Sequence, residues 1–178
     1  MKTKALYAGS FDPFTKGHEQ IVLDALKIFD EITILIAINP SKKRRFDFDE
    51  SLNAIKKVFS DYRQVKVEFY SGFIADYCKD NNINFSIRGL RNFFDFEYEE
   101  NIAKINAELN PNIKTIYLRT SNEIISSSMV WDLYSNGKDI SKYVPQEIFD
   151  YMTSKKSEII KKQTKNIKKL YKSKINTN

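Results

Sequence analysis

Apolar residues in the first 152 positions alternate between short continuous runs and longer runs with helical spacing. Residues 31–38 form a nearly continuous β-branched run, which is typical of a strand buried on both faces. Residues 18–29 instead place apolar side chains every three or four positions, which indicates a helix. The whole pattern predicts strands at 4–8, 31–38, 65–70, 84–87 and 114–118, and helices at 18–29, 49–59, 73–79, 93–109, 127–134 and 146–152.

Strands and helices that alternate with short connections are typical of an α/β fold with a single doubly wound parallel sheet. Helices must cover both faces of such a Rossmann-like sheet, and ligands bind at the carboxyl ends of its strands. The chain of 178 residues is long enough for one well-packed domain, which we assign to residues 1–152.

The net charge of +6 is concentrated at the C-terminal end of the chain. Residues 153–178 contain nine lysines and one acid, whereas the remaining residues hold 20 basic and 22 acidic side chains. We favour a solvated, disordered extension. The alternative is a basic amphipathic helix that contacts acidic lipid, nucleic acid or another subunit. We expect no membrane contact by this extension. Its only aromatic residue is Tyr171, which argues against a dedicated single-stranded nucleic-acid partner.

The remaining composition favours a cytoplasmic protein. No apolar run is long enough to span a membrane, and the N-terminus has no apolar segment of the kind found in signal peptides. The single cysteine, Cys78, cannot form an internal disulfide and is expected to fill the core of a protein in a reducing compartment.

The first candidate site follows the first predicted strand. There the sequence Gly9-Ser10-Phe11-Asp12-Pro13-Phe14-Thr15-Lys16-Gly17-His18 runs directly into a helix. Backbone N–H groups and the positive end of a helix dipole bind anions at such a junction. Gly9 would let the backbone approach a ligand, and Ser10 offers a hydroxyl to a phosphate oxygen. His18, the only histidine, either donates a hydrogen bond to a phosphate or merely caps the helix.

Other candidate ligands follow the later strands. Arg88-Gly89-Leu90-Arg91 comes after the fourth strand, and two arginines can bind phosphate bidentately. Lys42 follows the second strand, and Ser126-Ser127-Ser128 opens a predicted helix. Each has a simpler interpretation, namely solvated surface charges for the basic residues and an ordinary N-cap for the serines. Glu99, on an acidic helix face, is a candidate for a ribose hydroxyl or a water-bridged metal.

Together these motifs resemble one family, the bacterial 4'-phosphopantetheine adenylyltransferases of the nucleotidyltransferase superfamily. The resemblance covers about residues 1–152 and implies a Rossmann-like nucleotidyltransferase domain. It is carried by four blocks in order: residues 9–18, which match G-[ST]-F-D-P-x-T-x-G-H, then Arg88-Gly89-Leu90-Arg91, Asp95-Phe96-Glu97-Tyr98-Glu99 and Ile125-Ser126-Ser127-Ser128.

The resemblance implies transfer of AMP from ATP to 4'-phosphopantetheine, giving dephospho-coenzyme A and pyrophosphate in coenzyme A biosynthesis. It makes His18 the catalytic residue that stabilises the pentacovalent transition state. It also implies a homohexamer and a Mg2+ ion held mainly through the ATP phosphates. By the same resemblance, ATP is bound by Ser10, Phe11, His18, Gly89, Leu90, Arg91, Glu99, Asn122, Glu123, Ile124, Ile125, Ser126, Ser127 and Ser128, and phosphopantetheine by Ser10, Lys42, Ile74 and Arg88.

The chain departs from the family pattern at three places. Glu50-Ser51 stands where the family usually has Glu-Arg, and Trp131-Asp132 replaces a basic residue and a glutamate. The stretch 121–125 is about two residues short and lacks the usual aromatic residue, so the contacts to adenine are left open.

Two other functions are consistent with parts of the sequence. A related adenylyl- or cytidylyltransferase, for example one acting on nicotinate mononucleotide, shares the histidine loop but does not usually combine it with Arg-Gly-Leu-Arg and Asp-Phe-Glu-Tyr-Glu. A nucleotide- or nucleic-acid-binding module would instead use the basic extension. It would bind in a salt-dependent manner and turn over no ATP.

Overall fold

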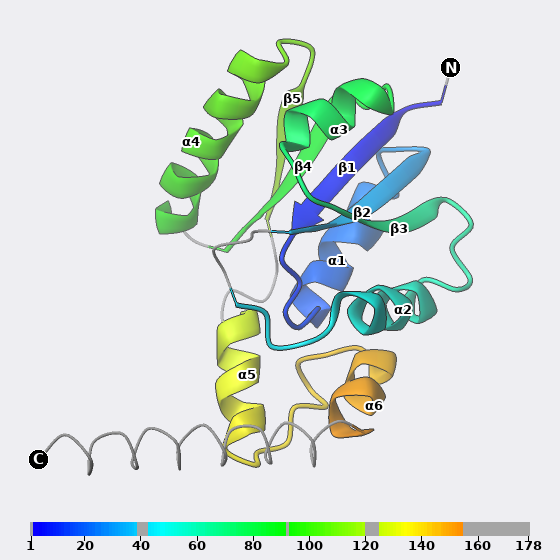
Figure 1. Cartoon of the computed structure of the whole chain (residues 1–178), viewed down its shortest axis with the longest axis vertical. Helices are drawn as coiled ribbons and strands as arrows, with labels where there is room; N and C mark the ends of the chain where they lie inside the picture. Colours follow the sequence, from blue (N-terminus) through cyan, green and yellow to red (C-terminus); the bar gives the residue numbers. More distant parts are fainter. Residues whose placement is uncertain (1, 39–42, 92, 120–124, 155–178) are drawn as a thin grey trace, which may run out of the picture.

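The computed structural model describes residues 2–38, 43–91, 93–119 and 125–154. Within them the chain forms a five-stranded, fully parallel sheet with the strand order β3-β2-β1-β4-β5 (Figure 1). The predicted doubly wound α/β fold is therefore confirmed. The strands are β1 (Lys4–Gly9), β2 (Glu31–Ala37), β3 (Val65–Tyr70), β4 (Phe85–Leu90) and β5 (Lys114–Arg119).

The sheet separates two apolar cores, because successive side chains of a strand point to opposite faces. Ala5 and Tyr7 of β1 belong to the larger core, and Leu6 and Ala8 belong to the smaller one. Helices α1, α2, α5 and α6 contribute to the larger core, α3 contributes to the smaller core, and α4 packs beside α3 and β4 (Figure 1). The helices are α1 (Lys16–Ala25), α2 (Phe48–Val58), α3 (Ile74–Asp80), α4 (Phe93–Leu109), α5 (Ser127–Ser135) and α6 (Gln146–Ser154).

The strand order creates one point where the direction of winding reverses. From β1 the chain moves outward to β2 and β3, and it then returns to place β4 on the other side of β1. Connections that leave β1 and β4 at their carboxyl ends diverge to opposite faces, which opens a crevice between them. Gly9 ends β1 and Leu90 ends β4, so two of the predicted phosphate-binding segments meet at this crevice.

Two elements differ from their predicted bounds by three residues or more at one end. Strand β4 continues to Leu90, three residues beyond the prediction, because Arg88, Gly89 and Leu90 pair with Tyr117, Leu118 and Arg119 of β5. Helix α1 ends at Ala25 rather than at residue 29. Its last turn tightens into shorter-range bonds, from the N–H groups of Lys27 and Ile28 to the carbonyls of Asp24 and Ala25.

The C-terminal part of the described chain closes the larger core. Met152 of α6 is fully buried, and α6 packs on α2. The predicted boundary after residue 152 falls within α6, while residues 155–178 of the lysine-rich extension lie outside the described residues. Of the helices described, none is both long and apolar enough to cross a membrane.

Candidate active site

The loop between β1 and α1 has an unusual backbone that apolar packing fixes. Phe11 has a φ of 44°, a left-handed conformation that a non-glycine residue adopts only at a cost of about 1–3 kcal/mol. The Asp12–Pro13 peptide is cis. A Cβ atom on Gly9 would lie 2.9 Å from Cε1 of Phe11, so the ring of Phe11 leaves room for no side chain at position 9. The side chains of Phe11 and Phe14 in this loop are both buried.

His18 is held by the first turn of α1. Thr15 is the N-cap, and its hydroxyl oxygen accepts a hydrogen bond from the His18 backbone N–H at 3.4 Å. In return, the backbone N–H of Thr15 donates to Nδ1 of His18 at 3.0 Å. Because Nδ1 accepts this bond, the neutral imidazole carries its proton on Nε2. His18 therefore does cap the helix, and the same contacts set its tautomer.

The imidazole of His18 is neutral at physiological pH. Burial lowers its pKa to about 4, and the positive charge of Arg91 lowers it further in the same direction. The rings of Phe11, Phe14 and Tyr7 surround it at centroid distances of 5.1, 5.3 and 6.3 Å. A fixed, neutral ring with a proton on Nε2 can donate a hydrogen bond to an anion without carrying a full charge.

A cavity of about 510 Å³ lies at the carboxyl ends of β1 and β4. It brings together most of the predicted site, although the segments involved are far apart in the sequence. Leu90 follows Gly89 in β4 but is not among the residues that line the cavity, and its predicted contact with ATP stays a prediction. Lys42, Asn122, Glu123 and Ile124 lie outside the described residues. The predicted residues that line the cavity are Ser10, Phe11, His18, Ile74, Arg88, Gly89, Arg91, Glu99, Ile125, Ser126, Ser127 and Ser128.

The cavity is also lined by residues that were not predicted as site residues, among them Tyr7, Tyr98 and Ile102. Tyr7 lies on β1 two residues before Gly9, and burial raises the pKa of its hydroxyl well above the ordinary value. Tyr98 and Ile102 lie on α4, next to Glu99 and one helical turn after it. Ile102 could have been found from the sequence, because helical spacing places it on the same face as Glu99. Tyr7 could not, because its position in the strand pattern is equally consistent with a core residue.

The two arginines of the Arg88–Arg91 segment are both paired with carboxylates. Arg88 forms an ion pair with Glu99 of α4, and it also donates to the carbonyl of Ala8 at 2.9 Å. Only 17% of the Arg88 side chain is exposed, so it is not a solvated surface charge. Arg91 binds both oxygens of Asp95 in a fork, at 2.9 and 3.0 Å, and is 36% exposed.

The serine segment at the start of α5 is divided between structural and exposed roles. Ser126 is the N-cap and accepts from the backbone N–H of Met129 at 3.1 Å, as the simpler interpretation predicted. Ser127 donates its hydroxyl to the carbonyl of Pro13 at 2.9 Å, which joins this segment to the loop after β1. Ser128 is exposed. The N-terminal ends of α1 and α5 therefore both border the cavity, and both favour negative charge there.

Comparison with known proteins agrees with this geometry. A family model described as cytidylyltransferase-like matches residues 6–132. The phosphopantetheine adenylyltransferase of Leptospira biflexa is 39% identical over 157 residues, which cover 87% of this chain and 98% of that protein. The chain belongs to the phosphopantetheine adenylyltransferase family. The Heliobacterium modesticaldum phosphopantetheine adenylyltransferase is 38% identical over 161 residues, covering 89% of this chain and 96% of the relative.

A more distant structural neighbour shares the fold alone. The crystal structure of a bifunctional NMN adenylyltransferase/ADP ribose pyrophosphatase from Francisella tularensis superposes with a TM-score of 0.69 at 16% identity. The alignment covers 97% of this chain but only 57% of that chain. Membership of the adenylyltransferase family makes the protein a nucleotidyltransferase, and it disfavours the interpretation as a non-enzymatic binding module.

Proposed function

We propose that the protein transfers AMP from ATP to 4'-phosphopantetheine, giving dephospho-coenzyme A and pyrophosphate, as a step of coenzyme A biosynthesis. The observation that carries this proposal is the neutral His18 imidazole, with its proton on Nε2, in a cavity that Arg88 and Arg91 also line. The family relationship supports the choice of the acceptor.

The proposed reaction needs positioning more than acid–base chemistry. An oxygen of the acceptor phosphate attacks the α-phosphorus of ATP, and the bond from that phosphorus to the pyrophosphate oxygen breaks. An ionised phosphate is already a nucleophile, so no general base is required. The Nε2–H group of His18 would donate a hydrogen bond to a non-bridging oxygen of the α-phosphoryl group, where negative charge increases in the transition state.

The arginines are proposed to bind the two reacting phosphates. Arg88 would bind the phosphate of phosphopantetheine and Arg91 the phosphates of ATP, with a guanidinium group matching two phosphate oxygens. In the structure their positions are already set by Glu99 and Asp95. Incoming phosphates would therefore share or replace these carboxylate contacts, rather than order two flexible side chains.

We also propose that Mg2+ enters with ATP. Across the described ranges, no three His, Cys, Asp or Glu side chains lie close enough together to hold a metal ion. The donor set that fits this cavity is the triphosphate itself, because Mg2+ favours phosphate oxygens and water. Bound there, it would neutralise part of the charge on the leaving pyrophosphate.

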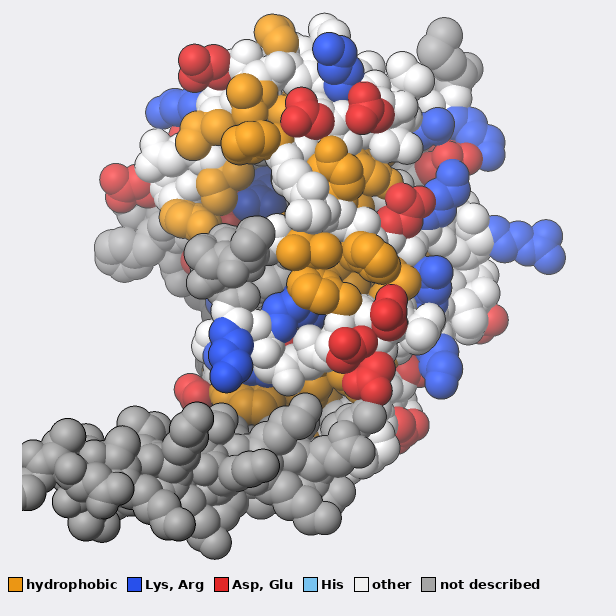
Figure 2. Space-filling model, viewed as in Figure 1, with side chains coloured by type: hydrophobic (Ala, Val, Ile, Leu, Met, Phe, Trp, Pro, Cys, Tyr) orange, Lys and Arg blue, Asp and Glu red, His pale blue; other side chains and the backbone are white. Residues whose placement is uncertain are grey.

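A cytoplasmic homohexamer is the proposed state of the protein. Helix α4 exposes Phe96, Tyr98, Ile105 and Leu109, each at least 40% accessible. Several hydrophobic groups of this kind interrupt the charged surface in Figure 2. Exposed apolar side chains on one helix are typical of a subunit contact. Light scattering coupled to gel filtration tests this assembly, and a monomer at micromolar concentration would contradict it.

One assay tests the proposed activity directly. Pyrophosphate release from ATP is measured with 4'-phosphopantetheine or nicotinate mononucleotide as the acceptor, and each with and without Mg2+. We expect release only with phosphopantetheine and Mg2+. Turnover with nicotinate mononucleotide alone would replace the proposal with the related adenylyltransferase activity.

A further inference from the structure

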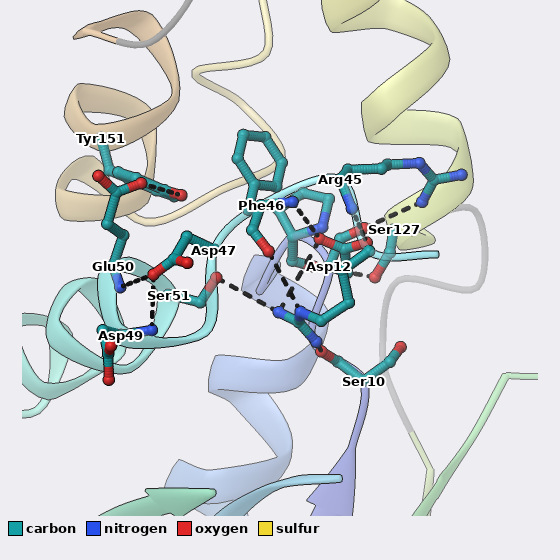
Figure 3. A network of polar contacts seen from close by, with 12 residues as sticks. Ser10, Asp12, Arg45, Phe46, Asp47, Asp49, Glu50, Ser51, Ser127 and Tyr151 are labelled. Carbon is teal, nitrogen blue, oxygen red and sulfur yellow. Dashed lines mark hydrogen bonds and ion pairs between the residues drawn. The ribbon is translucent and has the colours of Figure 1, made fainter. Parts of the chain in front are cut away.

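A basic segment between β2 and α2 packs against the loop that carries Ser10 and His18. The carboxylate of Asp12, which is 7% exposed, accepts the backbone N–H groups of Arg45 at 2.9 Å and Phe46 at 3.1 Å. Figure 3 shows these contacts converging on Asp12. Arg45 also donates to the carbonyl of Asp12 at 3.0 Å and lies over the ring of Trp131. The segment is thus tied to the active-site loop by both backbone and side-chain contacts.

The guanidinium of Arg44 lies within this contact. Its Nη1 donates to the carbonyl of Ser10 at 2.5 Å, and its Nη2 donates to Oγ of Ser51 at 3.3 Å. Its Nε donates to the carbonyl of Phe46 at 3.3 Å. The group also stacks on Phe48 at 4.5 Å, and only 12% of the Arg44 side chain is exposed. Because the planar guanidinium has hydrogen-bond partners on three sides, these contacts fix its orientation.

Ser51 gives this guanidinium its space. The residue is 5% exposed and has a short side chain. A second long basic side chain at position 51 would compete with Arg44 for the same volume. Nearby, Asp12 Oδ1 lies 3.9 Å from Arg44 Nη2 and partly offsets the cost of burying the positive charge.

The bond from Arg44 fixes one particular peptide of the cavity wall. The carbonyl of Ser10 belongs to the peptide that joins Ser10 to Phe11, and this peptide is trans. In a trans peptide the N–H group points away from the carbonyl, so Arg44 also sets the direction of the Phe11 N–H. This peptide precedes the left-handed Phe11, a conformation that needs support from its surroundings. Ser10 and Phe11 both line the cavity.

We infer that Arg44 is a positioning residue for adenylyl transfer: its guanidinium holds the Ser10–Phe11 peptide in the orientation in which Ser10 and Phe11 meet the phosphates of ATP. The inference rests on the proposed function. It adds to the site a residue that does not line the cavity and that the sequence alone did not single out.

The decisive variant is Arg44→Met, which keeps an apolar stem over Phe48 and removes every hydrogen-bond donor. The matched control is Arg63→Met at an exposed position before β3. Initial rates of pyrophosphate release are measured as functions of the ATP concentration and of the phosphopantetheine concentration. The assay temperature is at least 15 °C below the melting temperature of each variant, because a domain of this size is then essentially folded. We expect kcat/KM for ATP to fall about tenfold or more in Arg44→Met, and to stay within twofold in Arg63→Met.

A second readout separates positioning from stability. His18 is the only histidine in the chain, so its Hε1 proton should give a single NMR signal with which ATP binding can be followed in the absence of acceptor. We expect Arg44→Met to raise the Kd for ATP at least fivefold, while the chemical shift of the His18 Hε1 signal in the free enzyme stays unchanged. If Arg44→Met does not fold, Arg44→Lys keeps the charge beside Asp12, loses the fork of donors and is judged by the same criteria.

The inference is wrong if a folded Arg44 variant has wild-type kcat/KM and Kd for ATP. It is also wrong if the loss of kcat/KM disappears when the assay temperature is lowered further, because the loss would then come from residual unfolding. Failure of the proposed function has a different result, since wild-type protein would then release no pyrophosphate with phosphopantetheine.

Discussion

The two walls of the cavity are held in place by different physics. On the β1 side, His18 is fixed by a backbone hydrogen bond and three aromatic rings. On the β4 side, Arg88 and Arg91 are held by carboxylates. Contacts of the first kind persist when ligands bind, whereas an ion pair can be exchanged for a phosphate. Under the proposed function, the wall proposed to stabilise the transition state is rigid and the wall proposed to bind the substrates is exchangeable.

The largest effect is expected on the rigid wall, at the imidazole itself. His18→Ala should lower kcat by about 10³-fold or more, because it removes a donor aimed at the developing charge. The fold should survive, at a cost of about 1 kcal/mol for the lost helix cap. Steady-state kinetics and thermal unfolding measure the two effects. His18→Gln, which keeps an N–H donor, is the control, and kcat of His18→Ala near the wild-type value would refute the role.

On the exchangeable wall, Arg88→Met should raise KM for phosphopantetheine by about 10- to 100-fold. A change of this size is expected from the loss of one or two charge-assisted hydrogen bonds. It should lower kcat less than His18→Ala does. Arg91→Met, which removes the more exposed arginine, should act on KM for ATP instead. If both variants changed only kcat, the distinction between the two walls would be lost.

Gly9→Ala tests whether the rigid wall tolerates a small displacement. The added Cβ would meet the Phe11 ring at 2.9 Å, so the ring or the backbone must shift. We expect a loss of about 1–3 kcal/mol in stability, as for overpacking elsewhere. Denaturant unfolding measures the loss, and kcat should fall severalfold with it. Gly137→Ala is not a matched control, because Gly137 has a positive φ. Ala8→Gly, a change of one methyl group at the neighbouring position of β1, is used for comparison instead.

The pH dependence of His18 tests the rigid wall without any substitution. The unfolded chain takes up a proton on this residue near pH 6.5, whereas the folded protein does so only near pH 4. Lowering the pH across this window therefore favours the unfolded state, and the stability that His18 contributes is present above pH 6.5 and lost toward pH 4. The Hε1 signal should titrate with a midpoint near 4. A midpoint above 6 would contradict the buried, neutral ring.

Much of this architecture could be predicted from the sequence. Short apolar runs between longer runs with helical spacing located all five strands, and the glycine-bearing loop before His18 indicated where the cavity lies. The extension of β4 through Arg88 could not be predicted, because an Arg-Gly-Leu segment has no strand periodicity and is ordered by pairing with β5. Arg44 was missed for a similar reason. In a run of four basic residues, nothing local distinguishes the one whose partners lie seven and 34 positions away.

Trp131 is the only tryptophan in the chain, and it packs against Phe46 at 5.6 Å and Arg45 at 5.2 Å. Its fluorescence therefore arises from a single place, the contact between α5 and the segment that holds Asp12. Changes in emission wavelength or quenching will report movement of that contact, without any attached dye. Stopped-flow mixing with ATP can then reveal whether the active-site loop shifts before the chemical step or after it.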